Sequence, residues 1–357
     1  MDLYQFTEGI VTWLVSIVNW VLNWIGLNGL ANWLGGPDVI KFLTLLGESV
    51  VLLLVGFIVA ITMIWQERKT LGRLMDRRGA MVVGPAGYFQ NIADGLKTLL
   101  KEYIVPDKAD RTVYDWAPVI MIGSSILLLV AIPLSDRFYM SDLDAGLLFI
   151  FAVFSITPFA ILLGGWASNN KYTLIGGMRS AAQLISYEIP LLLSLVGVVL
   201  LAGSLNIGDI VNAQSDSTWF IIPQFIGFIV FMITIVAEVE RIPFDLPEAE
   251  AELVEGWWTE YGGMRFGLLM LAEYFRGYAG AAVAVLLFFG GWNGPFLPAE
   301  IWFMLKVFIV FFVFIWLRGS LTRVRIDQVL NIGWKRLLPL AMVNLVIAVA
   351  VKTLGWF

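Results

Sequence analysis

The chain has 357 residues, of which 59% are hydrophobic and only 14% are charged, and its formal net charge is −5. No soluble core needs so much apolar surface, so the composition predicts an integral membrane protein. Cys and His are both absent. This absence excludes disulfides, zinc held by Cys or His, thiolate-held iron–sulfur clusters and imidazole-held haem. We therefore expect no conventional electron carrier bound through side chains of this chain.

Eight segments are long and apolar enough to cross a bilayer as helices of about 20 residues. They cover residues 43–65, 117–134, 145–167, 174–205, 219–238, 264–289, 301–317 and 337–354. The predicted fold class is an all-α integral membrane protein with about eight transmembrane helices. Surface amphipathic helices on the cytoplasmic side and an N-terminal interfacial helix complete this prediction.

Lys and Arg are concentrated in alternate connections between the predicted spans. Nine follow the first span and five follow the seventh, whereas connections two, four and six carry one, none and none. Cytoplasmic loops of membrane proteins carry an excess of basic residues. We therefore expect a multi-pass protein of the cell membrane, over residues 41–357, with both termini outside. Its cytoplasmic loops are predicted at 66–116, 239–263 and 318–336.

Residues 1–40 precede this domain and predict a helix of another kind. Thr12, Ser16, Asn19 and Asn23 recur at helical spacing among Val, Leu, Ile and Trp, so they form a polar stripe. Such a stripe favours an interfacial helix over a ninth span.

Two of the predicted cytoplasmic connections contain short helices of their own. In GYFQNIADGLKTLLKEY, residues 87–103, polar side chains line one face and apolar side chains the opposite face. This helix is expected to lie flat on the membrane surface. In RIPFDLPEAEAELVEG, residues 241–256, Asp245 fits an N-cap with Glu248 as its partner, and Gly256 fits the end of the helix.

The same connection carries an unusual density of acids. Between Glu238 and Glu260 there are eight acidic residues and one basic residue, Arg241, with apolar segments on both sides. Carboxylates held together in a low dielectric are desolvated and repel one another, and both effects raise their pKa. The run therefore predicts a cluster that stores and passes protons. On a solvent-exposed loop the same charges would only keep the protein surface hydrated.

Ionisable groups also occur inside the predicted spans, where each costs roughly 2.5–3.5 kcal/mol near the membrane centre. They include Glu48, Arg179, Glu188, Glu273, Arg276 and Lys306. Glu273 and Arg276 could form an ion pair that holds helices together, and Glu48 and Lys306 could snorkel at the membrane edges. Glu188 has no cation within one helical turn, which favours a functional role for its carboxylate.

Several motifs resemble one known family. PFDLPEAEAELVEG at 243–256 and GYFQNIADGLKTLLKE at 87–102 closely resemble the two signature segments of the NuoH family, the membrane subunit that anchors respiratory complex I to its hydrophilic arm. Further matches are ERK at 67–69, RSAAQLISYEIP at 179–190, TEYGGMRFGLLMLAEY at 259–274, RVRIDQ at 323–328 and GWK at 333–335. Motifs this long and this numerous are specific, and they extend over residues 43–354.

The resemblance implies the membrane side of a quinone chamber and a glutamate path that couples quinone reduction to proton pumping. It implies a quinone or quinone-like lipid-soluble carrier as substrate, and no metal, haem or flavin in this chain. The implied partners are hydrophilic-arm subunits with the terminal iron–sulfur cluster, small and antiporter-like membrane subunits, and membrane lipids, with no nucleic acid.

Family motifs also imply the site residues. For the proton path these are Glu188, Glu238, Glu248, Glu250, Glu252, Glu260 and Glu273, with Arg179 beside them. For the quinone chamber or its entrance they are Arg68, Asp94, Lys97, Tyr261, Arg265 and Arg323.

The sequence departs from the family pattern on the predicted cytoplasmic side. Ala80 and Met81 replace a usual Pro-Asn, Thr322 replaces a Pro, and Leu330 and Asn331 replace a Met-His pair. These departures leave open the identity of the quinone and of the arm. The alternatives are a deazaflavin-linked methanophenazine-reducing complex, a ferredoxin-linked complex and a membrane-bound hydrogenase. A stand-alone secondary transporter is a different class, disfavoured because the chain shows no internal repeat.

Overall fold

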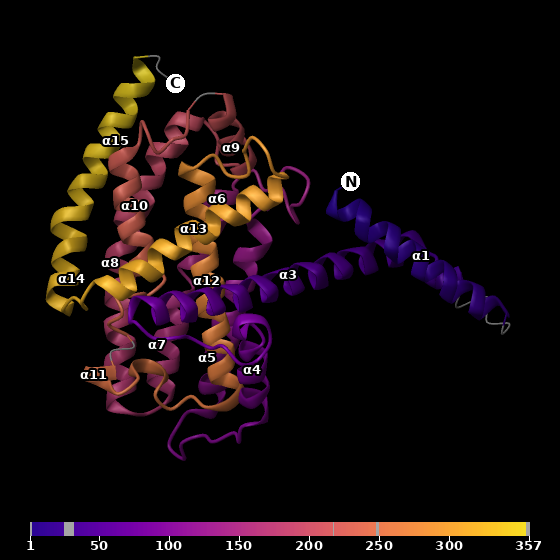
Figure 1. Ribbon diagram of the computed structural model, residues 1–357, viewed down its shortest axis with the longest axis horizontal. Coiled ribbons are helices and arrows are strands. Elements are labelled where there is room, and N and C mark those ends of the chain that lie inside the picture. The colour runs from indigo at the N-terminus through magenta and orange to yellow at the C-terminus, as the bar shows by residue number, and fades with distance from the viewer. Residues whose placement is uncertain (1, 25–31, 217, 248–249, 355–357) are drawn as a thin grey trace.

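The computed structural model of the chain describes residues 2–24, 32–216, 218–247 and 250–354. In these ranges the regular secondary structure is helical, without a β-strand. Seven helical stretches within them are long and apolar enough to cross a membrane, and Phe225–Glu238 is a shorter apolar helix. The predicted all-α membrane fold is thus confirmed (Figure 1).

The helices follow the predicted spans closely. They are α1 (Leu3–Trp24), α3 (Pro37–Leu74), α4 (Gln90–Leu100), α5 (Arg111–Ala131), α6 (Gly146–Phe154), α7 (Thr157–Ala167), α8 (Lys171–Ala202), α9 (Ile207–Asp216), α10 (Phe225–Glu238), α11 (Glu250–Leu253), α12 (Gly263–Phe288), α13 (Ala299–Ser320), α14 (Ile326–Ile332) and α15 (Leu338–Thr353). The predicted span 145–167 is divided into α6 and α7 at Ser155. The last span is α15, which follows α14 through a π-helical turn at Gly333–Leu337.

Helix α12 lies at the centre of the bundle (Figure 1). Nearly all of its membrane-length segment is buried against other helices, whereas most of the corresponding segment of α3 is not. The run from Gly277 to Ala284 consists mainly of Gly and Ala, and small residues let helix backbones approach closely. A Cβ at Gly280 would lie only 2.9 Å from Ile235 of α10. Small side chains therefore allow α12 its central position.

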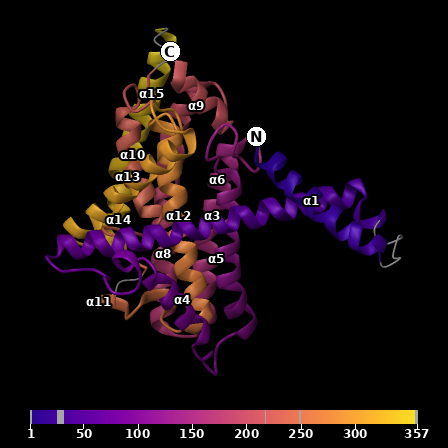
Figure 2. The ribbon, with the colours of Figure 1, turned by 45° about the vertical axis from the view of Figure 1, so that its right-hand side comes forward.

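Helix α3 crosses the bundle formed by α5, α8 and α12, and its N-terminal half extends beyond that bundle (Figures 1 and 2). Helix α1 packs along this half, because Gly47 of α3 faces Thr7 and Val11 of α1. The backbone N–H of Leu3 also donates to the carbonyl of Arg137, at 3.4 Å. The N-terminal segment is thus a helix, as predicted. Its position at the membrane interface stays a prediction.

Helix α4 turns its apolar side outward. Ile92, Leu96 and Leu99 are exposed, while the side-chain amide of Asn91 donates to the carbonyl of Ile61 in α3 at 2.9 Å. An outward apolar side of this kind is what a helix that lies flat on a membrane turns toward lipid.

Close packing of α8 against the turn at Gly256–Trp258 leads to a stability prediction. A Cβ at Gly176 would lie 2.7 Å from the backbone nitrogen of Trp257. Backbone atoms can move aside only at a cost in free energy. We expect Gly176→Ala to destabilise the protein by about 1–3 kcal/mol. Gly123→Ala in α5 is the matched control, since nothing lies within 4 Å of a Cβ there. Thermal unfolding of the purified assembly measures both, and equal midpoints would contradict the prediction.

Candidate functional site

A buried loop follows α10 and carries charge into the middle of the bundle. Residues 238–247 are almost entirely inaccessible. The loop is tolerated because carbonyls at the end of α10 and in the loop have partners: the Gln183 amide of α8 donates to Ala237 at 2.9 Å and to Phe244 at 2.8 Å. The backbone N–H of Val324 donates to Pro243 at 3.1 Å. Irregular backbone at membrane depth is stable only when its polar groups are satisfied in this way.

Arg241 of this loop joins two helices through two carboxylates. One guanidinium nitrogen donates to both oxygens of Glu67 in α3, at 2.9 and 3.1 Å. The other lies 2.9 Å from Glu273 of α12. Arg318 of α13 also binds Glu67. The guanidinium of Arg241 lies 4.8 Å from the ring centre of Tyr274, so an aromatic face adds a further favourable contact.

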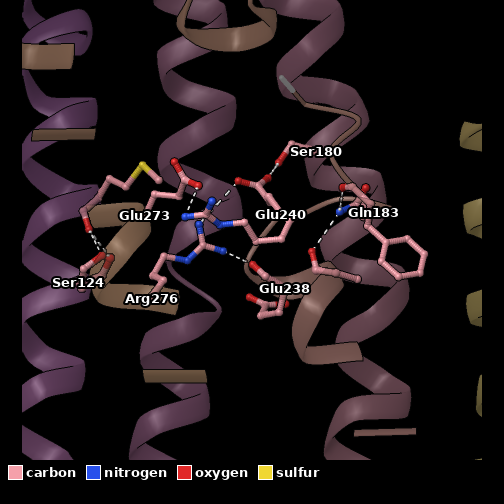
Figure 3. A network of polar contacts seen from close by, with 12 residues as sticks. Ser124, Ser180, Gln183, Glu238, Glu240, Glu273 and Arg276 are labelled. Carbon is pink, nitrogen blue, oxygen red and sulfur yellow. Dashed lines mark hydrogen bonds and ion pairs between the residues drawn. The ribbon is translucent and has the colours of Figure 1, made fainter. Parts of the chain in front are cut away.

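Arg276 of α12 is a second arginine at this buried loop, and it has its own set of partners (Figure 3). Its Nη1 lies 3.6 Å from Oε2 of Glu240, and its Nη2 donates to the backbone carbonyl of Glu238. The hydroxyl of Ser180 in α8 donates to Oε1 of Glu240. Arg276 is fully buried. The loop thus presents Glu240 and Arg241, neighbours in sequence, to charges of opposite sign.

An ion pair between Glu273 and Arg276, one interpretation of their spacing, is not formed. Glu273 binds Arg241, and Arg276 binds Glu240. The i,i+3 spacing places both side chains on one side of α12, but the loop supplies each with a partner from another element. Sequence spacing could not reveal these partners.

Asp245 does not act as the predicted helix N-cap. Its carboxylate binds Arg323 at 3.0 Å, which ties the loop to the segment before α14. Burial raises the pKa of Asp245, although the hydrogen bond from Arg323 acts in the opposite direction. We call Glu67, Glu238, Glu240, Arg241, Asp245, Glu273, Arg276, Arg318 and Arg323 the charged network.

Of two other predicted acids, Glu238 belongs to this network and Glu188 lies near it. The buried carboxyl of Glu238 is acted on by the charges of Arg276, Glu188 and Glu240. Glu188 is half-buried in α8 and accepts a hydrogen bond from Ser155, at the bend between α6 and α7. Glu188 therefore stands at the edge of the charged network, toward the neighbouring helix.

Tyr261 and Arg265 belong to a separate aromatic cluster. The rings of Tyr261 and Tyr114 stack with centroids 4.2 Å apart and planes at 3°. Arg265 lies 3.4 Å above the ring centre of Tyr103 and pairs with Asp115. Burial, followed by the charges and phenol nearby, raises the pKa of Tyr261. We call Tyr103, Tyr114, Asp115, Trp257, Tyr261 and Arg265 the aromatic cluster.

Glu260 lies with the aromatic cluster and not with the charged network. Its carboxylate accepts from the Asn170 amide at 2.7 Å, and its backbone carbonyl accepts from the Tyr114 hydroxyl at 2.6 Å. Glu252 lies elsewhere again, in a partly exposed pair with Arg179. Glu248 and the side chain of Glu250 lie outside the described residues.

Arg68, Asp94 and Lys97 lie at the junction of α3 and α4. Arg68 binds Asp94 at 2.6 Å, and the Gln90 amide donates to Asp94 at 2.9 Å. Burial acts to raise the pKa of Asp94, but these hydrogen bonds and the charge of Arg68 outweigh it and hold the pKa below its usual value. Lys97 is exposed beside this pair.

Comparison with known proteins places this arrangement in a family. The model of the NADH dehydrogenase family matches residues 48–349. The H subunit of NADH-quinone oxidoreductase from Anoxybacillus flavithermus is 49% identical over 314 residues, which are 87% of this chain and 93% of the relative. Its counterpart from Geobacillus thermodenitrificans is 48% identical, over 87% of this chain and 94% of the relative.

The chain belongs to the NADH dehydrogenase family. A third relative, the H subunit of NADH-quinone oxidoreductase from Bacillus cereus, is 48% identical over 81% of this chain and 88% of its own length. The resemblance seen in the sequence motifs is thus confirmed. The family match contains the whole charged network and the aromatic cluster, and it leaves α1 outside.

Several members of the charged network in this NADH dehydrogenase family protein were not predicted as site residues. They are Glu67, Glu240, Arg241, Asp245, Arg276 and Arg318. Two signals could have pointed to them, because Glu67 opens the ERK motif and Arg241 is the single base of the acidic run. Among the described residues, no group of three or more carboxylates is placed to hold a metal ion.

Glu48 and Lys306, whose snorkelling at the membrane edges stays a prediction, both have defined surroundings in the fold. Lys306 donates to the carbonyls of Phe289, Gly291 and Asn293 at 2.8–2.9 Å, so it fixes the turn that follows α12. Glu48 is 4% exposed in α3. Lys306 therefore has a structural role in this family member.

The central position of Arg241 leads to a second prediction. Arg241→Met would remove one of the two guanidiniums at Glu67 and the ion-pair partner of Glu273, and breaking a buried pair costs about 3–5 kcal/mol. Arg325→Met is the matched control, because the Arg325 side chain is 76% exposed in its pair with Asp327. Its expected effect is within about 0.5 kcal/mol.

Thermal dissociation of the assembled complex compares the two variants. We expect a clearly lower midpoint for Arg241→Met and a parental midpoint for Arg325→Met. Similar midpoints for both would show that the Arg241 pairs contribute no more than a surface ion pair.

Proposed function

We propose that this chain is the membrane subunit of a proton-translocating NADH:quinone oxidoreductase-type complex. In this complex it would form the membrane side of the quinone chamber and carry protons between buried carboxylates. Membership of the family supports the complex, and the names of the relatives support NADH and quinone as its reactants. The observation that carries the coupling role is the charged network, which joins α3, α8, α12 and α13 around one buried loop.

Charge balance explains how the network could hold a proton. It contains five carboxylates, Glu67, Glu238, Glu240, Asp245 and Glu273, and four guanidiniums, Arg241, Arg276, Arg318 and Arg323. With every group ionised, one negative charge would stay uncompensated in a buried site. An uncompensated buried charge is costly, and a group in this position takes up a proton instead. One proton in the network is therefore its favoured state.

Quinone reduction would supply the force that moves this proton. Reduction of a quinone to a quinol takes up electrons and protons, so negative charge develops at the chamber before protons neutralise it. Charges in a low dielectric act on one another over longer distances than in water. A change of charge at the chamber would therefore shift the proton affinity of the buried carboxylates, and protons would follow.

The aromatic cluster is the proposed chamber wall, and the Arg68–Asp94 junction with Lys97 its entrance. Tyr261, Tyr114 and Arg265 combine stacked rings with hydrogen-bond donors, which suits a quinone head group. The outward apolar side of α4 would admit the lipid-soluble tail. Arg323, proposed at the same chamber, also belongs to the charged network through Asp245.

Partners and orientation follow from the same proposal. The redox centres would belong to hydrophilic-arm subunits, because this chain has neither Cys nor His. These subunits would dock on the basic loops, which we place in the cytoplasm. The exposed apolar surfaces of α3 and α13 would meet lipid and the neighbouring membrane subunits.

The test is Glu238→Gln in the assembled complex, reconstituted in sealed vesicles. Gln keeps the size of Glu but cannot carry a proton, so we expect proton pumping and coupled quinone reduction to fall about tenfold or more. Glu8→Gln is the matched control, because Glu8 lies in α1 outside the family match.

Two results would overturn the proposal. Parental pumping and quinone reduction in the Glu238→Gln complex would remove the proton path. Ion flux through the purified chain alone, without an electron donor, would favour a stand-alone transporter.

A further inference from the structure

We propose that Glu240 is an additional proton-relay residue, which exchanges a proton with Glu238 while Arg276 serves as the counter-ion of both. This inference rests on the proposed proton path and adds a residue to it. It is carried by the backbone, the contacts and the charge balance around Glu240, which differ from those of the other buried carboxylates.

The backbone at Glu240 is held in an unusual conformation. Its φ is +57°, in the left-handed region that residues other than Gly seldom adopt. Such conformations persist where surrounding contacts fix them, and they cluster at functional sites. Here the turn ends α10 and presents the carboxylate of Glu240 to Arg276, while Arg241 reaches Glu67 and Glu273. The fold thus accepts a strained residue to place a carboxylate beside Arg276.

Glu240 and Glu67 differ in the partners of their carboxylate oxygens. Glu67 receives charge-assisted hydrogen bonds from two guanidiniums, those of Arg241 and Arg318. Oε2 of Glu240 lies 3.6 Å from Nη1 of Arg276, which is beyond hydrogen-bond distance. Oε1 of Glu240 accepts from the neutral hydroxyl of Ser180. The oxygens of Glu240 are therefore not held by guanidinium hydrogen bonds, unlike those of Glu67.

Arg276 faces both carboxyls that would share the proton. Its charge attracts Glu238 and Glu240 alike, and its Nη2 is fixed by the backbone carbonyl of Glu238. Two carboxylates and one guanidinium leave an excess of one negative charge, which one proton neutralises. Glu238 and Glu240 also act on each other directly. The three residues thus have the composition of a site that holds one exchangeable proton.

The remaining groups around Glu240 favour its protonated form. Burial, the largest effect, raises the pKa of Glu240, and Arg276 and the Ser180 hydrogen bond act in the opposite direction. Glu273 of α12 and Asp245 of the loop raise it further through their negative charges. Burial and like charges together prevail over Arg276.

The relay step is balanced as follows. The O–H bond of a protonated Glu238 breaks, and an O–H bond forms on a carboxylate oxygen of Glu240. Glu238 becomes the anion and keeps Arg276 as its counter-ion, while Glu240 becomes neutral. No net charge moves away from Arg276, so the step avoids an unpaired buried charge. Onward transfer to Glu273 would bring the proton to the Arg241 side of the charged network.

Two variants of the assembled complex test this assignment. Glu240→Gln keeps the volume of the side chain and an acceptor for Ser180, but it cannot carry a proton. We expect about a tenfold fall in proton pumping and coupled turnover, with partial recovery in Glu240→Asp. In redox-induced infrared difference spectra, Glu240→Gln should also lose a C=O band of a protonated carboxyl.

The variant Ser180→Ala tests the role of Glu240 even if the Glu240→Gln complex does not assemble. The Ser180 hydroxyl stabilises the ionised form of Glu240, so its removal raises the proton affinity of that carboxyl. We expect the limb of the pH–rate profile that reports Glu240 to move to higher pH, with the complex intact. A merely structural Glu240 would leave this limb unchanged.

The outcomes separate this inference from the proposed function. If Glu238→Gln is defective but Glu240→Gln pumps normally, the relay role of Glu240 is wrong and the proton path stands. If both pump normally, the path itself is wrong. If Glu240→Gln does not assemble, an unshifted pH profile in Ser180→Ala overturns the assignment, and a shifted profile supports it.

Discussion

The Arg241 guanidinium, buried between Glu67 and Glu273, is the interaction on which the rest of this structure depends. It lies in the loop after α10 and joins this loop to α3 and to α12, so it links three elements that are separated in the sequence. A charge at membrane depth persists only when it is paired. Because Arg241 satisfies two carboxylates at once, it fixes where α3 crosses the bundle and where the loop enters it. The other pairs, at Arg276 and Asp245, are placed around this centre.

Such a loop inside a helical membrane protein requires hydrogen-bond partners for its backbone and space between the helices. Gln183 and Val324 satisfy carbonyls of the loop, and the small residues of α12 leave room for it beside the central helix. The break in regular structure thus serves to bring Glu240 and Arg241 into the bundle, where a continuous helix would have hidden their side chains among apolar neighbours. The resulting excess of carboxylate over guanidinium is the basis of the proposed proton uptake.

The charged network and the aromatic cluster are separate sites with a shared support. Gly176 of α8 packs against Trp257 of the aromatic cluster, and Ser180, one turn later on the same helix, binds Glu240 of the charged network. Helix α12 carries Arg265 at one end and Glu273 and Arg276 further along. A displacement of α8 or α12 would therefore reach both sites, which is the mechanical requirement for coupling chemistry at one to protonation at the other.

The sequence by itself determined the helical spans, the family and the kind of chemistry, because apolar runs of membrane length and long motifs are local patterns. It also located three members of the network, Glu238, Glu273 and Arg323. Only the tertiary structure decided the pairings: Arg276 binds Glu240 and not Glu273, Asp245 binds Arg323, and Glu260 joins Tyr114 and Asn170. The physical reason is that an ion pair depends on distances between elements, and a buried loop with a left-handed turn sets those distances in ways that spacing along one helix does not show.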